Sequence, residues 1–427
     1  MRSICLNFQL HHALRLRHYP FFDIDADHYY FDDFQTDERL NRLVNESYLP
    51  ANRMLLEMIN GSGKKFKCAF SISGVMLEQF EMFVPELIDS FKDLAKTGCV
   101  EFLAEPYAHS LASVFDVNEF EAQSKLHAEK IESLFGVKPT VFCNTELIYS
   151  DTIAETVSRM GYRAIMTEGD NRTLGWKSPN NIYGHAYDPK LKVLMRNNKF
   201  SDDVALRFTD STWDGYPLTA DKYVAWINET LQENQVANIW MSYDTLGSIH
   251  RAETGIFDFF RALPYFAMEH KLIFMTPSEL LKNFTPTDKF VAPHYLSWAG
   301  EEKDLSLWTG NDLQQEALNK LYQVTERVRL CSDKMLQHDW LCIQPVENFR
   351  YMSHKDAWGT NYPSPYEAFI NYMNILSDFL NRVDAQYPTT IENEELNELL
   401  KTINNQEKQI VELEKELKKA RSRKELK

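Results

Sequence analysis

The chain has 427 residues, of which 44% are hydrophobic and 13% aromatic, and this composition excludes a disordered protein. Its 62 acidic and 46 basic residues give a formal net charge of −16. Because the basic residues are scattered, no concentrated positive face is expected, and neither nucleic acid nor a membrane is predicted as a partner. Met1–Phe8 has the pattern of a first strand rather than a signal peptide, and no segment approaches the roughly 20 apolar residues of a membrane span.

The six cysteines show neither CxxC pairing nor the spacing of metal ligands. Several of them lie in apolar runs, which favours reduced, buried thiols and a cytoplasmic location. They are Cys5, Cys68, Cys99, Cys143, Cys331 and Cys342.

Short apolar runs alternate with amphipathic helical patterns as far as about Thr276. Regular succession of strand, helix and strand predicts parallel strands with crossover helices, and seven or eight such units favour a closed barrel. The helical patterns include Glu78–Ala95 and Glu119–Phe135. The predicted strands are Ile4–Leu10, Cys68–Ser73, Val100–Leu103, Thr140–Cys143, Ala164–Thr167, Val193–Arg196, Asn238–Ser242 and Leu272–Met275.

The pattern changes after Pro277. Helical periodicity dominates Leu313–Leu330 and Pro365–Val383, which predicts a barrel over residues 1–289 and a helical domain over residues 290–386.

The tail, residues 387–427, has a heptad pattern that predicts an intermolecular coiled coil over residues 392–420 and hence a homo-oligomer. The alternative is a solvated helix lightly anchored to its own domain. The predicted seam positions are Leu396, Leu399, Ile403, Gln406, Ile410, Leu413, Leu417 and Ala420.

Polar side chains collect where the predicted strands end. In a parallel barrel these ends share one face, where active sites are built. The Glu146 and Asp244 carboxylates each end an apolar run, and two carboxylates facing one cleft suit glycoside hydrolysis. Strand-end carboxylates also cap helices or pair with arginine, so both interpretations stay open. The polar residues are His11, His12, Ser73, Glu105, Glu146, Glu168, Asp170, Ser242 and Asp244.

Metal chemistry is a further interpretation of these residues. His11, His109 and Asp170 could be ligands, as in barrel deacetylases. None has a second ligand at HxxxH, HxH or HxxE spacing, so neither a metal nor another cofactor is predicted.

Serine nucleophiles and tryptophans that stack on sugar rings are further candidates. Ser73 and Ser242 could be nucleophiles, but neither lies in a GxSxG elbow. Trp176 and Trp213 flank loops after strands and could stack on sugar rings, although a tryptophan is more often part of a core.

Three motifs resemble signatures of glycoside hydrolase family 57. Phe8–Arg15 resembles the first, a His-Gln-Pro that ends the first strand with an arginine shortly after, although this chain has His-His-Ala. Gly98–Phe102, followed by Tyr107 and His109, resembles the second. Asn144–Tyr149 resembles the third, whose glutamate is the catalytic nucleophile, and this assigns that role to Glu146.

Later segments, the Trp176 loop and Ser297–Asn311, are also similar to the family, so the resemblance spans about the first 380 residues. It implies an α/β fold with an incomplete TIM-like (β/α)7 barrel, a following helical domain and retaining chemistry on α-glucans such as amylose or glycogen. The substrate-binding residues that it implies are His11, Arg15, Glu101, His109, Trp176 and Trp298.

The fourth signature departs from the family pattern Asp-x-Glu-x-Phe-Gly, whose aspartate is the acid/base. With Gly247 fixing the register, Ser242 occupies the acid/base position and Asp244 the glutamate position. A serine hydroxyl cannot protonate a departing sugar oxygen at neutral pH, and such general acid catalysis is worth ~10²–10⁴ in rate. The sequence therefore predicts an α-amylase-like homologue that binds α-glucan and hydrolyses it weakly or not at all.

Two alternatives remain. Residues i and i+2 of a strand point to the same side, about 6–7 Å apart, so Asp244 could replace the missing acid in an active hydrolase or glucanotransferase. The other alternative is a non-enzymatic assembly protein organised by the coiled-coil tail.

Overall fold

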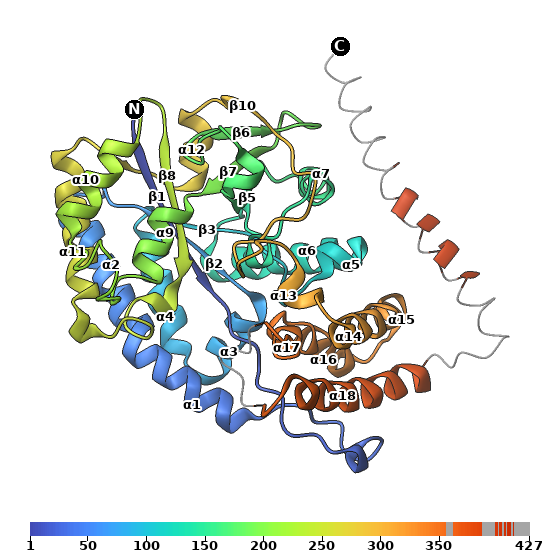
Figure 1. Ribbon diagram of the computed structural model, residues 1–427. Coiled ribbons are helices and arrows are strands. Elements are labelled where there is room, and N and C mark those ends of the chain that lie inside the picture. Colours follow the sequence, from blue (N-terminus) through green and yellow to red (C-terminus); the bar gives the residue numbers. More distant parts are fainter. Residues whose placement is uncertain are drawn as a thin grey trace.

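A computed structural model describes most of the chain. The described residues are 1–355, 362–386, 398–399, 401–403, 405–406, 408–410 and 413. In Figure 1 the strands and the helices around them occupy one side of the molecule, and α13 to α18 pack together beside them.

The first sheet is built around β1 (Ser3–Leu10), in which every residue is buried. β1 pairs in parallel with β8 (Val236–Ser242) on one side and with β2 (Cys68–Ile72) on the other. β3 (Val100–Phe102) follows β2, and β9 (Ile273–Phe274) pairs with the first residues of β1. Burial on both faces is what parallel strands show when crossover helices cover both sides.

The second sheet has the order β10-β6-β7-β5-β4. Its pairs are parallel except for that between β6 and β7, which is antiparallel. Backbone contacts join the two sheets, through a bridge between Ala104 and Phe142 and a 2.7 Å hydrogen bond from Asn197 N to Asn238 O. The strands are β4 (Val141–Phe142), β5 (Ala164–Glu168), β6 (Ile182–His185), β7 (Lys192–Arg196) and β10 (Asp288–Phe290).

All eight predicted strands are present, with ends that differ by no more than two residues. β6 and β10 were not predicted, because each is short and carries no long apolar run. The helices of this part are α1 (Asp33–Leu43), α2 (Leu49–Gly61), α3 (Gly74–Phe83), α4 (Pro85–Lys96), α5 (Ala112–Phe115), α6 (Val117–Phe135), α7 (Asp151–Arg159), α8 (Asn171–Leu174), α9 (Asn198–Ala205), α10 (Ala220–Thr230), α11 (Ile256–Glu269) and α12 (Pro277–Asn283).

Helix boundaries follow local chemistry. The predicted helical pattern Glu78–Ala95 is divided between α3 and α4, because Pro85 lacks a backbone N–H and begins a separate helix. The other predicted helix is α6, where the Asp116 side chain accepts a hydrogen bond from Glu119 N at the start. Gly136 ends α6 in the left-handed conformation, which suits glycine.

The C-terminal helices share a hydrophobic core with the second sheet and with the loop after β1, whose Tyr19 and Tyr30 are buried among them. The pattern Leu313–Leu330 forms two helices rather than one. The division of the chain at residue 289 stays a prediction. These helices are α13 (Ser306–Thr309), α14 (Asp312–Tyr322), α15 (Thr325–Leu330), α16 (Lys334–Ile343), α17 (Glu347–Arg350) and α18 (Pro365–Gln386).

The predicted coiled coil lies largely outside the described residues, including its positions Leu396, Leu417 and Ala420.

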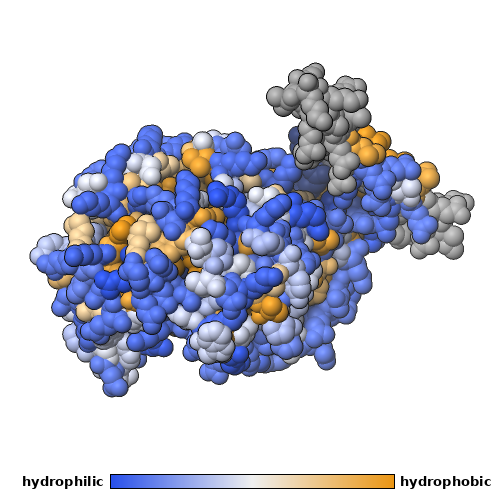
Figure 2. All heavy atoms as spheres, turned by 90° about the horizontal axis from the view of Figure 1, so that it is seen from above, coloured by the Kyte–Doolittle hydropathy of each residue, from blue (hydrophilic) through white to orange (hydrophobic). Residues whose placement is uncertain are grey.

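The surface seen in Figure 2 is mostly hydrophilic, with apolar residues interspersed among polar ones. None of the helices formed by the described residues combines the length and the hydrophobicity of a membrane span.

Candidate active site

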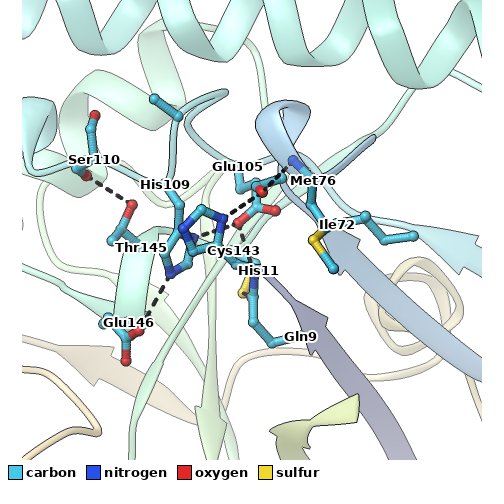
Figure 3. Close-up of polar contacts among 12 residues, drawn as sticks. Gln9, His11, Ile72, Met76, Glu105, His109, Ser110, Cys143, Thr145 and Glu146 are labelled. Atoms are coloured by element: carbon cyan, nitrogen blue, oxygen red, sulfur yellow. Dashed lines mark hydrogen bonds and ion pairs between the residues drawn. The ribbon is translucent and has the colours of Figure 1, made fainter. Parts of the chain in front are cut away.

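The carboxyl ends of β1 to β4 bring a group of polar side chains together (Figure 3). β1 supplies Gln9 and, just beyond its end, His11. The loop after β3 supplies Glu105 and His109, and the turn after β4 supplies Glu146. Because parallel strands end on one side of a sheet, residues more than 130 positions apart in sequence become neighbours.

Glu146 lies in the short 3-10 turn η3 (Thr145–Leu147) with a left-handed backbone, φ 51° and ψ 29°. Leu147 also has a positive φ, of 52°. This conformation is uncommon for residues other than glycine and persists where the surroundings hold it, often at functional sites. Here Thr145 Oγ1 donates to Ser110 O at 2.8 Å, and Ser297 Oγ donates to Glu146 O at 2.9 Å.

Two groups orient the Glu146 carboxylate. Its Oε2 accepts a 2.6 Å hydrogen bond from Trp298 Nε1, and its Oε1 lies 3.4 Å from His109 Nε2. The side chain is 18% exposed, so a ligand can reach it. A partly exposed carboxylate held by donors on both oxygens is suitable for nucleophilic attack on an anomeric carbon.

His109 lies between two carboxylates. Its Nδ1 is 3.0 Å from Glu105 Oε2, which also accepts a hydrogen bond from Gln9 Nε2 at 3.0 Å. Burial lowers the pKa of His109, but its hydrogen bonds to Glu105 and Glu146 outweigh this effect and raise the pKa to about 10. At neutral pH the ring is therefore a cation that donates to both carboxylates.

His11 stacks on His109, with ring centroids 4.2 Å apart. Its Nε2 lies 3.0 Å from Glu347 Oε2 and its Nδ1 lies 2.6 Å from Ser73 Oγ. Burial lowers the pKa of His11 and, together with the neighbouring His109 cation, outweighs the opposing effect of Glu347, so His11 is neutral at neutral pH. Neutral His11 can donate to Glu347 through Nε2 and accept from Ser73 through Nδ1.

Asp244 belongs to a second, adjacent polar group. Its Oδ2 lies 2.8 Å from His12 Nε2, and its Oδ1 accepts a 2.6 Å hydrogen bond from Tyr48. Burial raises the pKa of Asp244, but His12 and Tyr48 outweigh this effect and leave the pKa below its ordinary value. Asp244 is therefore ionised at neutral pH and has no proton to donate.

Ser242 ends β8 directly beside Gln9, its partner in the parallel ladder. Its hydroxyl accepts a hydrogen bond from Asp244 N at 3.3 Å. Gly247, which anchors the register of this motif, has φ 99°, and a Cβ there would lie 2.1 Å from Glu46 O. Only glycine fits that position, on which the predicted register of this motif rests.

Three residues predicted to bind substrate have other neighbours. The Glu101 carboxylate accepts hydrogen bonds from the backbone and side chain of Ser278 at the start of α12. Arg15 lines a cavity of about 300 Å³ together with Arg39. Trp176 is 90% exposed on a loop after α8. The structure thus brings His11, His109 and Trp298 to Glu146, but not these three.

Other predicted strand-end residues form ion pairs. Glu168 pairs with Arg196 at 3.1 Å, and the Arg196 guanidinium lies 5.4 Å from the centre of the Trp298 ring. Asp170 pairs with Arg172 on the surface. Arg196 therefore supports the indole that holds Glu146.

The sequence motifs assign no functional role to Glu105, Glu347 or Tyr48. The sequence places Glu105 among the polar residues at the predicted strand ends, but no nearby residue in the sequence indicates its hydrogen bond to His109. Glu347 comes from the short helix α17, 336 residues after His11, and Tyr48 lies within a helix 196 residues before Asp244. Their roles depend on which segments pack together.

His109→Gln should destabilise the protein by about 3–5 kcal/mol at pH 6, because it leaves two carboxylates without their cation. The folded-state pKa of His109 lies above its ordinary value of 6.5, so its stabilising charge is fully present below pH 6.5. That contribution is lost as the pH rises toward 10. Urea unfolding from pH 6 to 10 should show the wild-type free energy of unfolding falling toward that of the variant. Parallel curves would contradict the assigned charge.

Known proteins match this chain over most of its length. The model of the family described as Glycosyl hydrolase family 57 matches residues 5–293. A Methanocaldococcus jannaschii protein named "Putative alpha-amylase" is 37% identical over 369 residues, covering 82% of this chain and 78% of that protein.

Solved structures share the fold at low identity. A family 57 branching enzyme from Thermococcus kodakaraensis has a TM-score of 0.67 at 12% identity, covering 93% of this chain and 94% of the other. A 4-alpha-glucanotransferase from Thermococcus litoralis has a TM-score of 0.65 at 14% identity, covering 88% of this chain and 59% of the other.

The α/β fold is shared with glycoside hydrolases of family 57. The chain belongs to glycosyl hydrolase family 57, since the family model matches more than half of it. The resemblance drawn from the sequence motifs is confirmed.

Proposed function

We propose that this protein binds α-glucan at Glu146 and hydrolyses it weakly or not at all. The observation that carries the proposal is an oriented Glu146 carboxylate combined with Ser242 at the acid/base position. The relatives named as an alpha-amylase, a branching enzyme and a glucanotransferase support α-glucan as the ligand class.

The alternative of an active enzyme requires Asp244 to supply a proton. Both Asp244 oxygens are engaged, by His12 and by Tyr48, and its lowered pKa keeps it ionised. A general acid needs a pKa near the working pH. These contacts favour loss of efficient hydrolysis over rescue by Asp244.

Calorimetry with maltooligosaccharides tests the proposal, and wild-type protein should bind them. Trp298→Phe should weaken binding by about 10-fold, because a hydrogen bond to a charged group, worth about 1.5–3 kcal/mol, no longer orients Glu146. Trp226→Phe is the matched control, since Trp226 packs against Trp213 instead and its replacement should leave affinity unchanged. Wild-type protein that binds no maltooligosaccharide would contradict the proposal.

We also propose that the two sheets form the incomplete seven-stranded barrel, followed by a helical domain. The backbone contacts between β3 and β4 and between β7 and β8 support it.

A cytoplasmic location is favoured by six buried cysteines without disulfide bonds.

The tail is proposed to assemble copies of the chain. The described seam residues Leu399, Ile403, Ile410 and Leu413 have 43% to 62% of their surface exposed, so this apolar seam is available to a partner helix. A chain ending at residue 388 should therefore form a smaller oligomer than the full chain, with an unchanged melting temperature. Light scattering compares the two masses, and equal monomeric masses would refute the assembly role.

A further inference from the structure

Glu78, His338 and Cys342 form a compact cluster away from Glu146. Glu78 lies on α3, beside the sheet, whereas His338 and Cys342 lie on α16, in the C-terminal helices. One ligand atom from each residue lies within 4.8 Å of the other two. We infer that this cluster is a zinc site that links α3 to α16.

Two of the three interatomic distances are close to those between ligands of one ion. His338 Nε2 lies 3.0 Å from Glu78 Oε2 and 3.6 Å from Cys342 Sγ. With Zn–N and Zn–O bonds of about 2.1 Å and a Zn–S bond of about 2.3 Å, tetrahedral ligand atoms lie about 3.3–3.6 Å apart. Small side-chain adjustments would therefore place all three atoms at bonding distance from one ion.

Local structure also suits metal binding. His338 and Cys342 are four residues apart on one helix, so their side chains share a face. The second oxygen of Glu78 accepts a hydrogen bond from Tyr107, the kind of outer contact that orients metal-binding carboxylates.

The charge of the ligands and the access from solvent also favour a zinc ion. A carboxylate, a thiolate and a neutral imidazole carry two negative charges, which a divalent cation neutralises. Zinc binding forms the Zn–S bond and releases the thiol proton of Cys342 to solvent. Cys342 is fully buried, but His338 is 44% exposed and offers an entry path. Three protein ligands leave the fourth zinc position to water.

Cobalt(II) titration of the reduced full-length protein tests the site, because a cobalt–thiolate bond produces a charge-transfer absorption. One equivalent should bind, give this absorption and be displaced by zinc. Cys342→Ser should abolish the absorption, and His338→Gln should weaken binding by about 10-fold or more. Zinc should also raise the melting temperature of the wild type, because the ion binds only the folded chain.

Two variants serve as matched controls. Cys331→Ser removes another buried thiol, and His28→Gln removes another histidine–carboxylate pair, with Asp378. Both should bind cobalt like the wild type. Should Cys342→Ser fold poorly, Glu78→Gln provides the test, since it removes an anionic ligand but keeps an acceptor for Tyr107. Absence of the absorption in the wild type, its persistence in Cys342→Ser, or an unchanged cobalt affinity in His338→Gln and Glu78→Gln overturns the proposal.

Discussion

Glu146→Gln is expected to abolish the covalent glycosyl-enzyme that wild-type protein forms with an activated α-glucoside, lowering its rate by roughly 10⁴-fold or more. Aryl α-glucosides with acidic phenols need no general acid, because the phenolate leaves unprotonated. Glu146 can then attack the anomeric carbon, forming the ester bond as the bond to the phenolate breaks. Glutamine has no carboxylate for this attack, although its carbonyl oxygen can still accept the hydrogen bond from Trp298.

The wild-type intermediate should accumulate, because no general base activates water for the second step. Azide needs no base and should release it as a glycosyl azide with retained configuration. Mass spectrometry detects the adduct on Glu146, and the azide product gives a second measurement. Glu121→Gln is the control, since Glu121 forms a surface ion pair with Arg159. If the wild type binds the sugar but yields neither adduct nor azide product, the protein is a binding module.

Ser242→Asp is expected to raise turnover of natural α-glucan by roughly 10²–10⁴-fold, the usual contribution of a general acid. Ser242 pairs in register with Gln9, and neighbouring residues of parallel strands point to the same side. The Gln9 side chain reaches Glu105 beside His109, so a carboxyl group at position 242 would enter the same polar group.

Ser242→Asn is the matched control, because asparagine has the shape of aspartate without a transferable proton. Sugar release from maltooligosaccharide should increase only in the aspartate variant and should decline as the pH rises through the pKa of the new acid. Equal turnover in the two variants would show that a missing acid is not the main defect. The altered neighbours Ala13 and Asp244 would then be the next positions to restore.

Most of the features that could be predicted from the sequence depend on residues that are close together in the chain. Strand positions follow from apolar runs and helix boundaries from capping residues and proline, because both depend on local backbone chemistry. Glu146 and Ser242 were predicted because each lies in a short motif at a strand end. The missed break at Pro85 was also a local signal, visible in the sequence itself.

Only the tertiary structure decided how these residues are charged and oriented. The bonds of Glu146 to Trp298, of His11 to Glu347 and of Asp244 to Tyr48 join segments 152, 336 and 196 residues apart. Burial and such partners determine a pKa, and both arise from packing between distant segments. The amino-acid sequence by itself therefore determined the family and the strands, and it predicted the roles of Glu146 and Ser242. The folded chain determined that His109 is a cation and that both oxygens of the Asp244 carboxylate are engaged by His12 and Tyr48. It also determined that α3 contacts α16 at Glu78.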